Sequence, residues 1–133
     1  MNNMIKVAVC GAHMSGLPLN PQLTALGGEF VLATSTSADY QLFKLNSFTP
    51  ARPGLLRMLE NGNAIALEIW QLPIENYGKL VASVPSPLSF GTLKLADGST
   101  VQGFLCEAYA TLDAIDISHL GGWRNYLGTI KET

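Results

Sequence analysis

The sequence predicts a mixed α+β fold in which most strands are antiparallel. About seven short stretches have the alternation or the β-branched content of strands, against about three short helical patterns. The dipeptides Asn61-Gly62 and Asp97-Gly98 each stand between two strand-like stretches, where they favour β-hairpins. No Pro/Gly/Ser-rich run is long enough to be a linker, so we expect residues 1–133 to form one domain whose strands curl into a sheet or barrel.

The N-terminal half is expected to contain most of the strands and one short helix. Residues 5–10 are β-branched at every second position and end at Gly11, which is typical of a strand. Asn20 followed by Pro21 predicts a helix N-cap with proline at the first helical position, and Gly27-Gly28 ends that helix. The other strands expected here cover residues 29–34, 40–45, 55–59 and 64–72, with a proline-containing loop at 48–54.

The C-terminal half is expected to hold a helix, a hairpin and a second helix. Residues 74–84 change to a helical period that ends at Pro85. Residues 90–96 and 100–107 are the two strands around Asp97-Gly98. Ser118 is the expected N-cap of the last helix. Its apolar side is expected to comprise Leu120, Trp123, Tyr126 and Leu127.

The chain is slightly acidic and poor in charged residues. Among 133 residues, 8 are Lys or Arg and 10 are Asp or Glu, and 14% are charged against about 25% in typical soluble domains. Hydrophobic residues make up 47%, which excludes intrinsic disorder. The absence of a Lys/Arg cluster argues against a nucleic-acid partner. So little charge suggests that another chain covers part of the surface, and we expect a homodimer or a partner-covered face.

Neither a membrane segment nor a signal peptide accounts for the apolar composition. The apolar runs fall far short of the ~20 residues of a spanning helix, and the N-terminus lacks a basic region with an apolar core. Cys10 and Cys106 are too few for a disulfide framework or a zinc site and are expected to be buried free thiols. We therefore expect a cytoplasmic protein with no membrane partner, no metal and no cofactor.

The loop after the first expected strand is the most informative segment for function. Backbone N–H groups of the glycine-rich turn from Gly11 to Gly16 and the start of the helix at Asn20 could hold an anion beside His13. A histidine there can act as a hydrogen-bond donor, an acid or a base, because its pKa lies near neutrality. The alternative is that His13 only caps the turn and Asn20 only caps the helix. His119 is expected to be an exposed residue.

Two further charged residues stand inside apolar stretches. Strand alternation places Glu68 between Ala66 and Trp70, where a carboxylate must be paired, be protonated or face a cavity. Arg57 lies in a run of leucines and is a possible partner of Glu68 or of a substrate carboxylate. Solvent-facing positions on the strands are the alternative for both.

The segment Gly11-Ala12-His13-Met14-Ser15-Gly16-Leu17-Pro18-Leu19-Asn20 resembles the G-A-H-x-S-G-x-P-L-N signature of the allophanate hydrolase C-terminal domain. Further matches follow in the same order, and together they cover nearly the whole chain. They are Pro53-Gly54-Leu55-Leu56-Arg57, Leu67-Glu68-Ile69-Trp70-Gln71-Leu72-Pro73, Pro85-Ser86-Pro87-Leu88, Gly91-Thr92-Leu93, Asp97-Gly98, Gly103-Phe104-Leu105-Cys106-Glu107 and Gly121-Gly122-Trp123-Arg124.

The resemblance implies a gamma-glutamylcyclotransferase-like fold, a mixed β-barrel with flanking short helices around a pocket. In allophanate hydrolase this domain follows an amidase-signature domain that deaminates allophanate. The C-terminal domain has been assigned the next step, the conversion of N-carboxycarbamate to ammonia and carbon dioxide. It has also been interpreted as an assembly module, because that dianion can decompose unaided.

The resemblance leaves three hypotheses about the function, of which the first two are the main ones. In the first, the protein is an enzyme for a small carboxylated urea-type metabolite, with His13 and Glu68 as catalytic candidates. The candidate substrate-binding residues are Gly11, Ala12, Ser15, Gly16, Asn20 and Arg57. In the second, it is a non-catalytic module that binds a separate amidase-signature protein. Gamma-glutamyl cyclisation ranks last, because Cys10-Gly11-Ala12-His13 replaces the Tyr-Gly-Ser-Leu-type loop, and Glu68 and Glu75 match the catalytic glutamate by position only.

Overall fold

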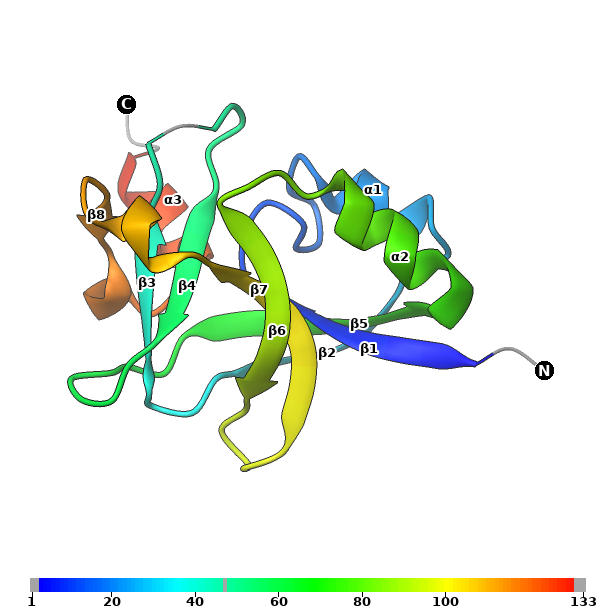
Figure 1. Cartoon of the computed structure of the whole chain (residues 1–133), viewed down its shortest axis with the longest axis horizontal. Coiled ribbons are helices and arrows are strands. Elements are labelled where there is room, and N and C mark those ends of the chain that lie inside the picture. The colour runs from blue at the N-terminus through cyan, green and yellow to red at the C-terminus, as the bar shows by residue number, and fades with distance from the viewer. Residues whose placement is uncertain (1–2, 47, 131–133) are drawn as a thin grey trace.

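The computed structural model describes residues 3–46 and 48–130. Within these residues, eight strands form two β-sheets, with short helices around them (Figure 1). The larger sheet has the strand order β2-β5-β1-β7-β6, and the smaller sheet has the order β4-β3-β8. The strands are β1 (Met4–Val9), β2 (Glu29–Ser35), β3 (Tyr40–Lys44), β4 (Pro53–Arg57), β5 (Ala66–Pro73), β6 (Leu88–Lys94), β7 (Thr100–Cys106) and β8 (Ile115–Asp116). The α-helices are α1 (Asn20–Thr24), α2 (Ile74–Ser83) and α3 (Trp123–Ile130), and 3-10 helices span Ala108–Thr111 and Ser118–Leu120.

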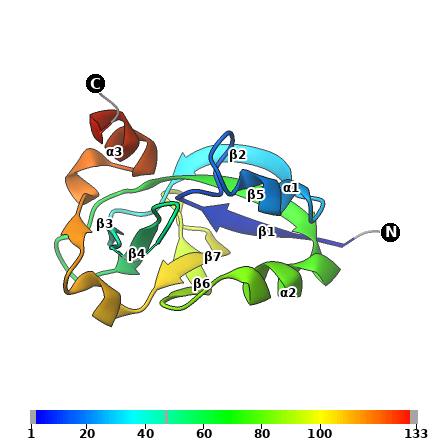
Figure 2. The same cartoon turned by 90° about the horizontal axis from the view of Figure 1, so that it is seen from above.

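Strands β1 and β5 form the centre of the larger sheet. They pair antiparallel from Met4 opposite Pro73 to Val9 opposite Glu68, and β1 also pairs in parallel with β7. Helix α2 lies alongside β1 (Figure 2). The apolar residues that are almost completely buried are Val7, Ala8 and Val9 of β1 and Leu67, Ile69, Trp70 and Leu72 of β5. Burial of their side chains therefore fixes the carboxyl end of β1, from which the loop with His13 begins.

The predicted α+β class is confirmed, whereas the strands within the described residues form two sheets and not one closed barrel. The two edge strands of the larger sheet approach each other at a single bridge, between Thr36 and Leu95. Figure 2 shows β3 and β4 beside the carboxyl end of β1, so the two sheets face each other there.

The two expected hairpins have different outcomes. Strands β6 and β7 pair around Asp97-Gly98 as expected, and Gly98 has a φ of 88°. Asn61-Gly62 does not form a hairpin, because β4 pairs with β3 in the smaller sheet while β5 pairs with β1 and β2. The segment is instead a connection between the sheets. The expected loop at 48–54 is shorter than predicted, since β4 already begins at Pro53.

The helices differ from the expectations mainly at their ends. Helix α2 agrees with the prediction, but neither Asn20 nor Ser118 is a helix N-cap. The Ser118 hydroxyl accepts a hydrogen bond from Leu42 N–H, and Gly121, with a φ of 82°, separates the 3-10 helix from α3. Strand β8, which pairs with β3, was not expected. None of the helices in the described ranges is long and apolar enough to cross a membrane.

Candidate functional site

The loop after β1 is held in a compact turn by its own backbone. Met14 N–H donates to Gly11 C=O at 3.0 Å, and Leu19 N–H donates to Ala12 C=O at 2.9 Å. A Cβ atom on Gly11 would lie 2.5 Å from Cδ of Pro53, so the loop can pass this close to β4 only with glycine at that position. Gly16, with a φ of 77°, ends the turn in a left-handed conformation.

His13 is buried and its ring is fixed on two sides. Its Nε2 atom lies 2.8 Å from Oε1 of Gln22 in α1, and its ring centroid lies 4.9 Å from that of Phe104 in β7. The Asn20 amide donates to His13 C=O at 2.8 Å. Asn20 therefore stabilises the His13 loop and does not cap α1, contrary to its expected role as the N-cap. With Gln22 Oε1 as the acceptor, Nε2 carries the proton and Nδ1 keeps its lone pair.

Arg52, directly before β4, is the cation whose charge acts on this histidine. The residue is only 7% exposed, and its Nη1 atom has no hydrogen-bond partner among the described residues. Neither ion pair found within residues 3–46 and 48–130 involves it. Burial lowers the pKa of Arg52, but a guanidinium stays protonated at neutral pH. Arg52 therefore brings a positive charge into the protein without an anionic partner in the described structure.

Burial and the charge of Arg52 act together on His13. Burial lowers the pKa of His13, the hydrogen bond to Gln22 opposes this, and the Arg52 guanidinium lowers it further. The net effect leaves the pKa below its ordinary value, so the imidazole is neutral at pH 7.

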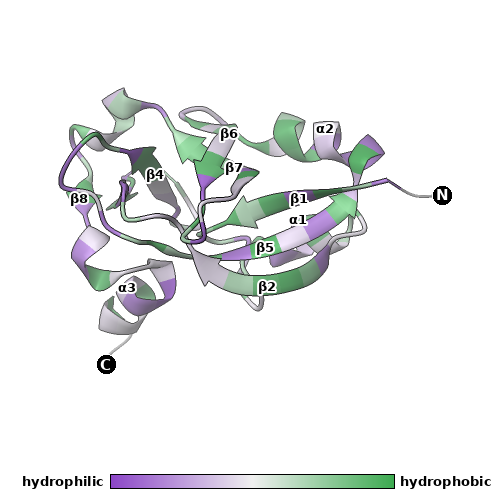
Figure 3. Ribbon diagram, turned by 90° about the horizontal axis from the view of Figure 1, so that it is seen from below, coloured by the Kyte–Doolittle hydropathy of each residue, from purple (hydrophilic) through white to green (hydrophobic). Residues whose placement is uncertain are grey.

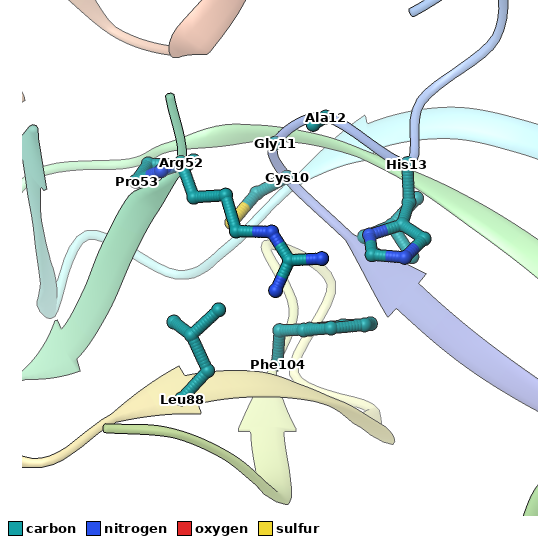
Figure 4. A pocket seen from close by; sticks show the side chains of 9 residues that line it. Cys10, Gly11, Ala12, His13, Arg52, Pro53, Leu88 and Phe104 are labelled. Carbon is teal, nitrogen blue, oxygen red and sulfur yellow. The ribbon is translucent and has the colours of Figure 1, made fainter. Parts of the chain in front are cut away.

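A narrow cavity separates His13 from Arg52. Figure 4 shows both side chains pointing into the same space, with the ring of Phe104 and Leu88 below them. The space open to the centre of a water-sized molecule is about 20 Å³, and the empty volume including the open mouth is about 290 Å³. About one small group, such as a carboxylate, fits inside, and a larger ligand would extend through the mouth. The lining residues are Val9, Cys10, Gly11, Ala12, His13, Arg52, Pro53, Leu88 and Phe104.

Three residues at the start of the loop have backbone N–H groups without an acceptor among the described residues. None of the hydrogen bonds found among the described residues uses the N–H of Gly11, Ala12 or His13 as donor. All three residues line the cavity. Free N–H groups on consecutive residues are a common way to bind an anion. The cavity is therefore lined by one cation, by a neutral imidazole and by residues whose N–H groups have no acceptor among the described residues.

The two cysteines are buried free thiols, as expected. Cys10 lines the cavity, and burial raises its pKa to about 12, with a smaller contribution from Cys106. Burial also raises the pKa of Cys106, to about 11. Neither forms a thiolate at neutral pH, so the cavity offers no sulfur nucleophile.

Glu68 lies outside this cavity and has several partners. Its Oε1 atom accepts hydrogen bonds from Ser15 N–H at 2.8 Å and from the Trp70 indole at 3.0 Å, and its Oε2 atom lies 2.9 Å from Nη2 of Arg124. Burial alone would raise the pKa of Glu68, but these hydrogen bonds and the Arg124 charge hold it below its usual range. The carboxylate is therefore ionised and paired.

Arg57 is not brought together with His13 or with Glu68. It stands at the other end of β4 from Arg52, its side chain is 53% exposed, and it lies 3.9 Å from Asp39. The partner of Glu68 is Arg124, and not Arg57 as the sequence suggested. Ser15, Gly16 and Asn20 also lie outside the lining of the cavity, whereas Gly11, Ala12 and His13 are part of it. His119 is exposed, as expected.

Sequence reasoning missed both Arg52 and Gln22. Arg52 stands in the expected proline-containing loop, immediately before the Pro53-Gly54 pair that matches the family pattern. That position was the available signal, since a cation next to a rigid strand start can be held in a fixed direction. Gln22 had no signal, because its partner lies nine residues away in the chain.

The fold defines the class of protein first. A solved gamma-glutamyl cyclotransferase superimposes on 86% of this chain and 70% of its own length with a TM-score of 0.60 at 12% identity, which shows a shared fold and no more. The domain is thus gamma-glutamylcyclotransferase-like in fold.

The sequence comparison is more specific than the fold. Residues 5–128 match the allophanate hydrolase C-terminal domain, and the chain belongs to that family. The chain is 39% identical to urea amidolyase of Saccharomyces cerevisiae, in a match that covers 96% of this chain and only 7% of the yeast protein. Allophanate hydrolase of Kluyveromyces lactis has a TM-score of 0.93 at 35% identity, over 97% of this chain and 22% of that one. A uropathogenic E. coli-specific protein has a TM-score of 0.89 at 40% identity, over 95% of this chain and 97% of that one.

Proposed function

We propose that the protein binds a small carboxylated urea-type metabolite in the His13–Arg52 cavity and promotes decarboxylation of N-carboxycarbamate. The observation that carries the proposal is the Nη1 atom of Arg52, which is buried and lacks a hydrogen-bond partner among the described residues. The guanidinium lies over the ring of Phe48, with Cζ 5.4 Å from the ring centroid, but it has no anionic partner among the described residues. A buried charge without an anionic partner costs roughly several kcal/mol, of which a cation–π contact offsets a part. A ligand carboxylate removes that cost by accepting two hydrogen bonds from the guanidinium.

The other polar groups of the cavity fit the second half of such a ligand. The N–H groups of Gly11, Ala12 and His13 can hold the second carboxylate of a dianion, in the place that the sequence suggested for the loop. Arg52 takes the carboxylate-binding role that the sequence suggested for Arg57. Ser15, Gly16 and Asn20 then support the loop rather than contact the ligand.

His13 supplies the proton that the bond cleavage requires. The neutral imidazole of the empty cavity takes up a proton when a dianion binds, because two negative charges more than offset the repulsion from Arg52. The C–N bond of N-carboxycarbamate then breaks, its electron pair stays on nitrogen, and His13 protonates that nitrogen as carbon dioxide leaves. The product carbamate takes a second proton and releases ammonia and the second carbon dioxide.

Ammonia release from N-carboxycarbamate, generated in place by an amidase acting on allophanate, tests this function. We expect release to be faster with the protein than without it, and His13→Ala to lose about 100-fold of the enhancement. His119→Ala, at the exposed second histidine, serves as the matched control and should behave as the wild type. A wild-type rate equal to that without protein would contradict the catalytic role.

A second candidate function is assembly with a separate amidase-signature protein in urea metabolism. It is favoured by the family relatives, in which this domain is a small part of urea amidolyase, and by strand β2 at the edge of the larger sheet. Phe30 and Leu32 on β2 are 51% and 44% exposed, and Figure 3 shows hydrophobic residues along much of this strand. The alternative is that two copies of this chain form a homodimer through the same β2 edge. In either case we propose a cytoplasmic location.

Co-purification and sedimentation distinguish these uses. A stable complex with an amidase-signature protein that Leu32→Lys disrupts supports the assembly function. Self-association that the same variant abolishes supports the homodimer. If the protein is a monomer without an amidase partner and still speeds ammonia release from N-carboxycarbamate, only the enzymatic function is supported.

A further inference from the structure

We propose that Glu68 and Arg124 are positioning residues for His13, which they hold through the backbone of Ser15. The inference rests on the proposed function of the His13–Arg52 cavity. It gives Glu68 a role different from that of a group in contact with the ligand, and it assigns a role to Arg124 in α3.

The geometry around Ser15 is the first part of the argument. Its N–H donates to Oε1 of Glu68 at 2.8 Å, and its C=O accepts from Nη2 of Arg124 at 2.7 Å. The same Nη2 atom lies 2.9 Å from Oε2 of Glu68. One ion pair therefore binds the peptide groups on both sides of Ser15. Charge-assisted hydrogen bonds of this length are among the stronger ones in proteins.

The position of Ser15 in the loop is the second part. It follows His13 by two residues, and the side chain of Met14 between them is 3% exposed. The next residue, Gly16, has the left-handed φ of 77° and no side chain to hold it in place. Pro53 fixes the start of the turn by its contact with Gly11, and the ion pair fixes its end at Ser15. His13 lies between these two fixed points.

The attachment of α3 is the third part. Ala66 N–H, at the start of β5, donates to Gly121 C=O at 2.8 Å, and a Cβ on Gly122 would lie 3.0 Å from Cβ of Ala66. Trp123 is 2% exposed. Since Glu68 lies two residues further along β5, the packing of α3 on this strand places Arg124 beside the carboxylate.

Glu68 and Arg124 do not line the cavity that contains His13 and Arg52. They line a separate depression together with Met14 and Trp123. Their effect on a ligand must therefore pass through the loop.

The Arg124→Gln variant tests the inference, with Arg57→Gln as its matched control. Both arginines are about half exposed, at 48% and 53%, and each is paired with one carboxylate. No hydrogen bond or ion pair among the described residues joins Arg57 to the loop. The sequence has two histidines, so the imidazole resonances of His13 can be followed by NMR with His119 as internal reference. Arg124→Lys, which keeps the charge, serves as the conservative variant.

In Arg124→Gln we expect the His13 resonances to shift and broaden and the pKa of His13 to move toward its ordinary value, because the ring leaves its buried position. The His119 resonances should not change. Affinity for malonate, a stable analogue in which CH₂ replaces the NH of N-carboxycarbamate, should fall on the order of tenfold. Arg57→Gln should change none of these, and Arg124→Lys should restore part of the affinity.

The outcomes separate this inference from the proposed function. Unchanged His13 resonances and malonate affinity in a folded Arg124→Gln protein would overturn the positioning role, while binding by the wild type would still support the cavity. If the wild type bound no malonate, the proposed function would fail. The His13 resonances would then decide the positioning role alone, since they need no ligand.

Discussion

Two arginines of this domain have opposite surroundings. Arg124 is half exposed, yet it is bound to a carboxylate at 2.9 Å and to the Ser15 carbonyl. Arg52 is 7% exposed, and one of its nitrogen atoms has no partner among the described residues. A buried charge needs a partner more than a charge near the surface does. The structure supplies carboxylate and carbonyl partners for Arg124, but it supplies no anion for Arg52 among the described residues. The difference supports our proposals that Arg124 holds the loop in place and that Arg52 binds a ligand.

The largest expected effect distinguishes Arg52, directly before β4, from Arg57 at the other end of that strand. Arg52→Gln should weaken malonate binding about 100-fold, since the variant removes the charge that faces the ligand carboxylate. Its free energy of unfolding should stay the same or rise, because an unpaired buried charge is removed. Isothermal titration calorimetry and urea unfolding measure both quantities. Arg57→Gln is the control, and loss of binding in that variant instead would place the ligand at the exposed end of β4.

The next effect concerns the paired carboxylate. Glu68→Ala should lower the free energy of unfolding by about 2 kcal/mol, because Ser15 N–H and the Trp70 indole lose their acceptor. Glu75→Ala, at an exposed position of α2, should change it by less than about 0.5 kcal/mol. Equal urea midpoints for the two variants would show that the Glu68 interactions contribute no stability.

The smallest effect is the pH dependence of stability. The pKa of His13 is lower in the folded protein than its ordinary value of 6.5, so the unfolded chain binds the proton first. The free energy of unfolding should therefore fall as the pH drops below about 6.5 toward the folded-state pKa. The pKa of Glu68 is also lowered, so its contribution is present above about pH 4.5 and is lost below that pH.

Unfolding of the wild type and of His13→Gln at a series of pH values separates the two contributions. The variant should lose the upper part of the pH dependence and keep the acidic part. A wild-type curve that is flat between pH 6.5 and 5 would contradict the burial of a neutral His13.

Local sequence patterns predicted the parts of the fold that depend on local rules. Alternation along residues 5–10 is sufficient for β1, and Asp97-Gly98 is sufficient for the hairpin of β6 and β7, because both depend on neighbouring residues only. Asn61-Gly62 carries the same hairpin signal, but β4 finds its partner in β3 on the other side. The choice of partner strand depends on packing between the sheets, which a dipeptide does not encode.

The candidate site was predicted only in part, because its local segment is visible in the sequence and its long-range contacts are not. The resemblance located the loop with His13, and the structure places Gly11, Ala12 and His13 at one cavity. The sequence pointed to Arg57 and missed Arg52, because one precedes and the other ends the same short strand and only burial distinguishes them. Glu68 was correctly identified as anomalous, since a carboxylate on an apolar strand needs partners. That those partners come from the loop and from α3 depends on contacts that span 53 and 56 residues of the chain.

The most direct test of the account is a crystal structure of the protein grown in the presence of malonate. The account predicts one malonate carboxylate at hydrogen-bond distance, about 3 Å, from Nη1 of Arg52, with the ligand beside the His13 ring. Malonate bound elsewhere, with Nη1 of Arg52 still without a partner in the occupied crystal, would contradict the claim that this cavity is an anion site.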